Sequence, residues 1–429
     1  MTQIRFVLAS CSITAILILS SAVAQTTNSA AEPQKRQEAP LIASELTASD
    51  GVAGNALGLV VAVSGNTVVV GEDCLRIGDN PHCDTRHQGV VYVYQKPKNG
   101  WGNMVQTAEL TPSDGFVGDE FGTSLAISGK TIVVGAGNAG KAYVFVKPAG
   151  GWKNMTETAQ LNNGEEGDNF GNVVAIDQGT IVVGVPNATI NGNQSQGAAF
   201  VFVEPETGWA TTSTYDAKLT ASDGTFEDVF GIAVAVSGDT IVVGAPFHQD
   251  QTGPGEAYVF VKPLTGWVGA TQTATLTRSI QGPFDEFGLA VAINRNTIVV
   301  GAPQAMGTNN GQGTVDVFVK PFAGWADKSE TAELVAPIQI QHFGFAVAVK
   351  GRSVVVGTFD PNNVIFVYDK PMIGGWKSTS QPQAQLTAGN KGAFFGFSMA
   401  MSGTTIVAGA PYQTVNGKAD QGAAFVLSQ

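Results

Sequence analysis

One sequence pattern recurs seven times along this chain, and repeats of this kind bury their apolar residues only by packing against one another. The fourth copy is the clearest: residues 230–246 read FGIAVAVSGDTIVVGAP. Its two apolar runs, 232–236 and 240–243, suit strands that are buried on both faces. Residues 237–239 between them, Ser-Gly-Asp, favour a hairpin turn, since Gly supplies a positive φ and Asp tolerates one. Each copy is therefore predicted to contain a β-hairpin, whose strands we name A and B.

Each hairpin is followed by a third strand (C), a Gly-Trp pair and a fourth strand (D) that ends at a leucine. In the fourth copy, strand C is Ala257–Val261. The leucine opens each repeat: Leu46, Leu110, Leu161, Leu219, Leu276, Leu334 and Leu386. All six tryptophans share one place: Trp101, Trp152, Trp209, Trp267, Trp325 and Trp376. A place shared by every repeat favours packing between repeats over carbohydrate-binding platforms, which are the alternative for aromatic side chains.

The seventh repeat has no strand D of its own, because the sequence stops just after its strand C at residues 423–427. Residues 40–47, PLIASELT, resemble the D strand at residues 106–111, QTAELT. Pairing this N-terminal segment with the last strand C would complete the seventh unit and remove the exposed edges of an open array. The sequence thus predicts an all-β fold over residues 40–429, a seven-bladed β-propeller of four-stranded blades closed by its own N-terminal strand.

The Phe-Gly pair that opens strand A and the Gly-Ala-Pro that ends strand B resemble the FG-GAP repeat of integrin α-subunit propellers and of many exported bacterial proteins. The fourth, fifth and seventh units keep both motifs, as in Phe287-Gly288 and Phe395-Gly396, whereas the first has Leu57-Gly58. The resemblance covers nearly all of residues 40–429. It implies a propeller that binds ligands on the face formed by the B–C and D–A loops.

One feature of the integrin repeats is missing. Their calcium loop, D-x-[DN]-x-D-G, lies between strands A and B, where this chain has only tight turns such as residues 237–239. One or two acidic groups cannot supply the six to eight oxygen ligands that Ca²⁺ takes. The chain is more similar to the calcium-free bacterial variety, and we expect no metal and no cofactor.

The N-terminal segment has the pattern of a secretory signal. Arg5 precedes an apolar core at residues 6–20, and Ala22-Val23-Ala24 is a small-residue cleavage site, so residues 1–24 are predicted to be a signal peptide. An uncleaved membrane anchor is the alternative, because the apolar stretch is nearly long enough to span a bilayer. Residues 25–39 are polar and predict a disordered leader. We expect a secreted protein, extracellular or periplasmic, with no membrane insertion after cleavage.

The net charge argues against two classes of partner, and the cysteines predict a disulfide. With 35 acidic and 23 basic residues the net charge is −12, which argues against nucleic acid and anionic membranes as partners. Cys74 and Cys83, the two cysteines outside the signal, close a short loop and predict a disulfide in an exported chain. His82 and His87 nearby leave a metal site, or free thiols, as alternatives.

In an up-and-down blade the B–C and D–A loops share one face, which we call the loop face, and the B–C loops vary most between repeats. Variable loops on a fixed scaffold are where binding usually occurs. The D–A loops of the second to fifth units carry the candidate ligand-binding residues: Asp119, Glu120, Glu165, Glu166, Asp168, Asp223, Glu227, Asp228, Asp285 and Glu286. Units six and seven have no acidic residue there. A cationic partner or a bridging cation over this sector is one hypothesis. The other, which is the more usual role of acidic residues in loops, is that these residues cap turns and keep the surface soluble.

No catalytic constellation is found. The glycine run at residues 135–140 matches a dinucleotide fingerprint, but a strand, not a helix, is predicted to follow it. His248 and His342 stand alone in the sequence. The chain is expected to be an exported, monomeric, non-catalytic binding module for an extracellular protein or glycan in adhesion or surface recognition. An enzyme that uses acidic residues of the loop face, and a scaffold without a small ligand, are the alternatives.

Overall fold

The computed structural model describes residues 42–72, 88–165, 168–248, 252–306 and 312–428, all within one compact unit, Leu41–Gln429. The predicted signal peptide (1–24), the leader (25–39), the Cys74–Cys83 disulfide and Glu166 lie outside these residues. Within them, no helix has the length and apolar character that a membrane crossing requires.

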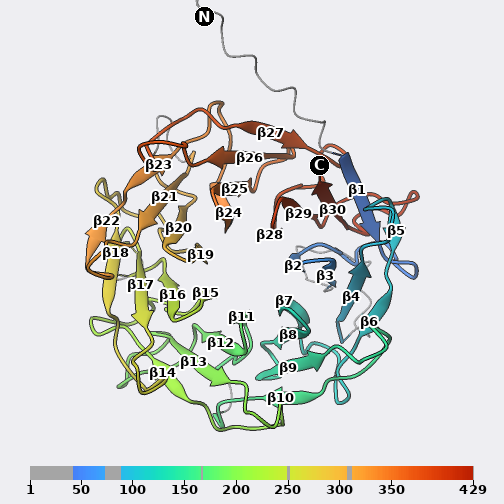
Figure 1. Cartoon of the computed structure of the whole chain (residues 1–429), viewed down its shortest axis with the longest axis horizontal. Coiled ribbons are helices and arrows are strands. Elements are labelled where there is room, and N and C mark those ends of the chain that lie inside the picture. Colours follow the sequence, from blue (N-terminus) through green and yellow to red (C-terminus); the bar gives the residue numbers. More distant parts are fainter. Residues whose placement is uncertain (1–41, 73–87, 166–167, 249–251, 307–311, 429) are drawn as a thin grey trace, which may run out of the picture. The chain divides into compact units, whose positions relative to one another are not determined.

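Seven sheets follow one another around a ring (Figure 1). Blades 1 to 3 consist of β2 (Val60–Ser64), β3 (Thr67–Glu72), β4 (Val90–Gln95) and β6 (Ala108–Leu110); β7 (Phe121–Ser128), β8 (Thr131–Ala136), β9 (Lys141–Val146) and β10 (Ala159–Leu161); and β11 (Val173–Asp177), β12 (Thr180–Val185), β13 (Ala198–Val203) and β14 (Ala217–Leu219). Blades 4 and 5 consist of β15 (Ala233–Ser237), β16 (Thr240–Ala245), β17 (Glu256–Val261) and β18 (Ala274–Thr277); and β19 (Ala290–Asn294), β20 (Thr297–Ala302), β21 (Thr314–Val319) and β23 (Ala332–Leu334). Blades 6 and 7 consist of β24 (Phe343–Lys350), β25 (Ser353–Thr358), β26 (Val364–Asp369) and β27 (Ala384–Thr387); and β28 (Met399–Ser402), β29 (Thr405–Ala410), β30 (Ala423–Ser428) and β1 (Ile42–Thr47).

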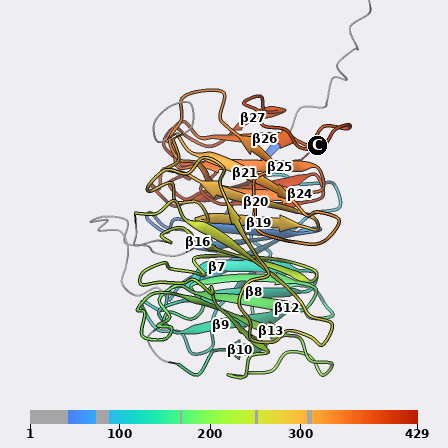
Figure 2. The ribbon, with the colours of Figure 1, turned by 90° about the vertical axis from the view of Figure 1, so that its left-hand side faces the viewer.

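The predicted seven-bladed propeller and its closure are confirmed. In every blade the A strand lies innermost and the B, C and D strands follow it outward (Figure 1), and edge-on the strands run between two faces of loops (Figure 2). Strand β1 supplies the D strand of blade 7. It pairs antiparallel with β30, from Ile42 opposite Ser428 to Leu46 opposite Ala424.

Two sheets have a fifth strand that the sequence pattern did not predict. β5 (Met104–Val105) and β22 (Lys328–Ser329) pair in parallel with β1 and β18, the outermost strands of the preceding blades. Single parallel bridges occupy the same place elsewhere: Leu110–Met155, Leu161–Thr212, Leu219–Ala270 and Leu334–Thr379. Six of the seven leucines that open the repeats are therefore the points where the chain beyond a tryptophan attaches to the neighbouring blade.

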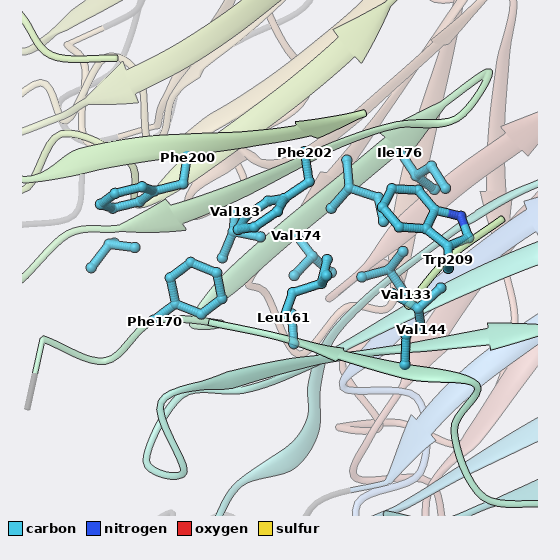
Figure 3. Close-up of a cluster of buried hydrophobic side chains, with 14 of the residues drawn as sticks. Val133, Val144, Leu161, Phe170, Val174, Ile176, Val183, Phe200, Phe202 and Trp209 are labelled. Carbon is cyan, nitrogen blue, oxygen red and sulfur yellow. The ribbon is translucent and has the colours of Figure 1, made fainter. Parts of the chain in front are cut away.

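The apolar core consists of seven clusters, each between two adjacent blades. Figure 3 shows the one between blades 2 and 3, where Phe170 and Phe202 meet edge to face, 6.0 Å between ring centroids, beside Leu161 and Trp209. Five of the six tryptophans are only 6–8% exposed, and Trp101 packs against its cluster while partly exposed. This confirms that the repeated tryptophans pack between blades.

The structure explains why the repeat needs glycine in both motifs. At the joint between blades 4 and 5, the carbonyl oxygen of Gly288 lies 1.9 Å from where a Cβ on Gly244 would be, and Gly288 itself has φ +101°. The Gly288 amide also donates to the carbonyl of Gly301 in its own blade, at 3.1 Å. In all seven joints a Cβ on the glycine of strand B would lie within 2.2 Å of the next blade's carbonyl oxygen. These glycines therefore set the spacing between blades.

Gly244→Ala is expected to lower the free energy of unfolding by about 3 kcal/mol, because the methyl group would overlap a backbone oxygen that cannot move without separating two blades. Gly150→Ala is the control. Gly150 is exposed and a Cβ there meets nothing within 4 Å, so that variant should unfold like the wild type. Equilibrium denaturation in urea measures both, and equal stability of the two variants would contradict this account of the joint.

The face opposite the loop face is tied together by its turns. Side chains at the ends of the A strands accept hydrogen bonds from backbone amides of the next blade's turn, as Ser64 does from Gly129 at 3.1 Å and Asp177 from Gly238 at 2.8 Å. All seven A–B turns line a central funnel of about 380 Å³. The A–B turns therefore join neighbouring blades on this face.

Candidate functional site

Four of the predicted acidic residues accept hydrogen bonds from backbone amides of the D–A loops to which they belong. Asp119, Asp168, Asp228 and Asp285 all lie two positions before the phenylalanine of the Phe-Gly pair. Asp119, Asp228 and Asp285 each accept a hydrogen bond from the amide three residues earlier, at 2.6–2.8 Å, and Asp168 accepts one from the amide of Phe170 at 3.1 Å. Asp168, Asp228 and Asp285 are also buried. For this position the turn-capping interpretation fits the geometry.

The other described candidates remain at least partly exposed and are spread over four blades: Glu120, Glu165, Asp223, Glu227 and Glu286. Glu120 and Glu286 stand directly before the Phe-Gly pair, with φ of 60° and 55°. The same position has a positive φ in the other five units: Ala56, Asn169, Val229, His342 and Phe394. Burial raises the pKa of Glu286, against the opposing effect of His342. The structure does not gather the predicted residues into one site.

Two cavities open on the loop face between blades that carry these residues. One, of about 620 Å³, is lined by residues 137–141 together with Asn162, Glu165 and Asn169. It lies beside the B–C loop of blade 2, which is the shortest of the B–C loops. Asn169 donates a hydrogen bond across the cavity to Asn138 at 3.2 Å. The other, of about 400 Å³, is lined by Ser195, Glu227, Val229 and Phe247.

A group of aromatic side chains lies on the loop face of blades 6 and 7. Phe345, Phe359, Phe394, Phe397 and Tyr412 form this aromatic patch, and all five are partly exposed. Phe359 stacks on Phe394 with ring centroids 4.8 Å apart and on Phe345 at 5.4 Å, both with an interplanar angle of 29°. Phe397 and Tyr412 extend the contacts on either side. None of the five belongs to the seven buried clusters, so the patch is apolar surface in addition to the core.

The pattern of acidic residues does not predict this patch, because units six and seven have no acidic residue in their D–A loops. The indication was present in the residues that flank the Phe-Gly pairs. They read HFGF at residues 342–345 and FFGF at 394–397, and Phe359 replaces the proline of Gly-Ala-Pro in the sixth unit.

His248, which stands alone in the sequence, meets three acidic residues in the structure. Its Nδ1 lies 3.0 Å from Asp228 Oδ2, and its Nε2 lies 3.9 Å from Glu256 Oε2. Asp223 completes the group and accepts a hydrogen bond from Tyr258 at 3.2 Å. Burial raises the pKa of Glu256, and the histidine beside it opposes that shift. Burial would lower the pKa of His248, but Asp228 and Glu256 raise it.

Asp285 belongs to a different buried network in blade 5. Arg278 contacts Asp285 at 2.6 Å, Asp316 at 3.0 Å and Glu333 at 2.9 Å. Arg278, Asp285 and Asp316 are all at most 6% exposed. Because Arg278, Asp285 and Asp316 are enclosed, this network holds blade 5 to the loop before it and offers little to a ligand.

The model of the family described as FG-GAP repeat matches six stretches of the chain, residues 42–94, 104–145, 156–202, 214–260, 270–318 and 381–427. No curated protein matches the chain. The first stretch begins at β1, so the family's repeat unit runs from strand D of one blade to strand C of the next. The unmatched stretch between residues 318 and 381 contains most of blade 6, including Phe345 and Phe359 of the aromatic patch.

Proposed function

The chain belongs to the FG-GAP repeat family, and on this premise we propose that it is an exported, non-catalytic binding module that recognises an extracellular protein or glycan through its loop face. The aromatic patch is the observation that carries the proposal. Five large rings held partly exposed on a rigid scaffold supply contact area at little cost in conformational entropy. Such a surface suits the apolar face of a sugar ring or the side chains of a protein partner.

The rest of the face supports the same role. The exposed acidic groups of blades 2 to 5, such as Glu165 and Asp223, would favour a partner with positive charge. The signal-peptide pattern of residues 1–24 supports action outside the cytoplasm, in the extracellular space or the periplasm. The ring is complete with β1 in place, and we propose that the protein works as a monomer in adhesion or surface recognition.

Phe394→Asn is expected to weaken binding by about tenfold, or about 1.4 kcal/mol, because it removes the ring that contacts both Phe359 and Tyr412. The fold should be kept, since Asn169 occupies the same left-handed position in blade 3. The measurement is binding of residues 25–429 to a glycan array and to a panel of purified extracellular proteins.

Phe322→Asn is the matched control, because Phe322 is fully exposed in a C–D loop on the opposite face. Equal binding by the wild type and both variants would place recognition elsewhere. A wild-type protein that binds nothing on the array or the panel would favour the scaffold alternative.

An enzyme acting through the loop face is the second candidate, because Asp223 and Glu256 converge on His248. Neither cavity described above is lined by these three residues, which is why binding is the leading proposal. The enzymatic alternative requires turnover of a glycoside, ester or peptide substrate that His248→Gln abolishes.

A further inference from the structure

The group around His248 has the composition and geometry of a metal site. One ligand atom each from Asp223, His248 and Glu256 lie within 4.8 Å of one another. They come from three segments on the loop face of blade 4: the D–A loop, the B–C loop and the first residue of β17. We propose that these three side chains bind a divalent transition-metal ion, Zn²⁺ by their ligand chemistry. The proposal is independent of the aromatic patch.

The histidine is held ready to act as a ligand. Asp228 is 1% exposed and anchored by the amide and hydroxyl of Thr225, at 2.6 and 2.8 Å. Its carboxylate can only accept, so Nδ1 of His248 donates to it, and in the neutral imidazole the lone pair then lies on Nε2, the nitrogen nearer Glu256. A carboxylate on the far nitrogen of a metal-binding histidine is the usual arrangement, because it fixes the ring and raises its basicity.

The distances admit an ion. Nε2 of His248 and Oε2 of Glu256 are 3.9 Å apart, too far for a hydrogen bond. Zinc binds nitrogen and carboxylate oxygen at about 2.0–2.2 Å, so one ion can reach both atoms at once. Oε2 of Glu256 is buried and accepts no hydrogen bond from any residue in the part of the chain that the structure describes. An imidazole with two carboxylates suits zinc, whereas Ca²⁺ takes six to eight oxygen ligands.

Blade 2 has a cationic side chain at the position that corresponds to Glu256 of blade 4. There Asp114 accepts a hydrogen bond from Tyr143 at 3.0 Å, as Asp223 does from Tyr258 in blade 4. The first residue of strand C is Lys141 in blade 2, which pairs with Asp114, and Glu256 in blade 4. Blade 4 therefore has a carboxylate where blade 2 has an ammonium group, and a bound cation would restore the balance of charge.

The test is the melting temperature of residues 25–429, treated with EDTA and then given micromolar ZnCl₂, together with the stoichiometry of binding by calorimetry. A rise of several degrees and one ion per chain are expected, since an ion bound only by the folded state stabilises it. CaCl₂ should produce no rise. His248→Gln and Glu256→Lys should both abolish the response to zinc, and Glu256→Lys, which copies blade 2, should melt in EDTA no lower than the wild type.

A Cys74→Ser/Cys83→Ser variant separates this site from the cysteines and histidines of the first B–C loop. It should bind zinc like the wild type, and Co²⁺ bound to the protein should lack the intense near-ultraviolet band of cobalt–thiolate bonds. Absence of zinc binding by the wild type would overturn the proposal. So would binding that survives both His248→Gln and Glu256→Lys, or that is lost in the cysteine variant.

Discussion

Deletion of residues 40–47 is expected to abolish the folded ring. Without β1, strand β30 loses its only outer partner, and its amide and carbonyl groups become an exposed edge along the whole of blade 7. Leu46, which is fully buried in the cluster between blades 7 and 1, is lost as well. Loss of a buried leucine side chain alone costs about 2–5 kcal/mol, and the backbone pairing with β30 and β5 disappears with it.

The matched control is deletion of residues 25–39 alone, which leaves β1 in place. Calorimetry and size-exclusion chromatography should show a cooperative, monomeric protein for this control and an aggregating one, without a cooperative transition, for the longer deletion. A synthetic peptide of residues 40–47 should restore part of the transition by adding the missing strand in trans. A protein lacking residues 40–47 that melted like the control would show that blade 7 is stable without closure.

Arg278→Met is expected to lower the free energy of unfolding by about 4 kcal/mol near pH 8. The variant leaves Asp285 and Asp316 buried with no cation beside them, and removing one partner of a buried ion pair costs about 3–5 kcal/mol. Lys141→Met is the control. The Lys141–Asp114 pair has the corresponding role in blade 2 but is about one-third exposed, and loss of a surface pair costs less than about 1 kcal/mol.

The loss should depend on pH in a direction that follows from Asp316. Burial raises the pKa of this carboxyl to about 7, against the opposing effect of Arg278. A group whose pKa is higher in the folded state favours folding when protonated, so its contribution is complete below the unfolded value near 4 and is lost as the pH rises through 7. Without Arg278 the folded pKa rises further, so Arg278→Met should be less harmful at pH 5 than at pH 8.

A double variant tests whether the lost stability comes from the buried carboxylates that are left without a cation. Blade 4 has Ala221 and Tyr258 where blade 5 has Arg278 and Asp316. Arg278→Ala/Asp316→Tyr should therefore recover at least half of the lost stability, measured by urea denaturation at both pH values. An Arg278→Met loss independent of pH, or no recovery in the double variant, would contradict the charge-based explanation.

The fold could be predicted from sequence because its determinants are local and repeated. Turn chemistry and apolar runs define each hairpin within about twenty residues, and β1 was found because it resembles the D strands of the other units. The joints could not be predicted in the same way. The contact of Gly244 with the Gly288 carbonyl depends on the distance between blades, which no local pattern states.

The candidate sites were less predictable, because they depend on which loops meet. Asp228 and Glu227 are adjacent acidic residues that the sequence does not distinguish. In the structure Asp228 is buried against His248, whereas Glu227 lines a cavity. His248 is part of a candidate site only because Asp223 and Glu256, from other segments of the chain, lie beside it. Phe345 and Phe394 flank the Phe-Gly pairs of their units, and the repeat pattern does not indicate that these flanking side chains are partly exposed and meet on one face.

The closure of the ring by β1 also constrains the order in which the parts of the protein fold. The first described strand to leave the ribosome is the last to find its partner, because residue 42 must wait for residue 428. In an unstructured chain, bringing those ends together would cost about 5 kcal/mol of loop entropy. Stacking of the intervening blades shortens the gap first. Insertion of β1 beside β30 should therefore follow the stacking of the blades between them and be the last, slowest step of folding.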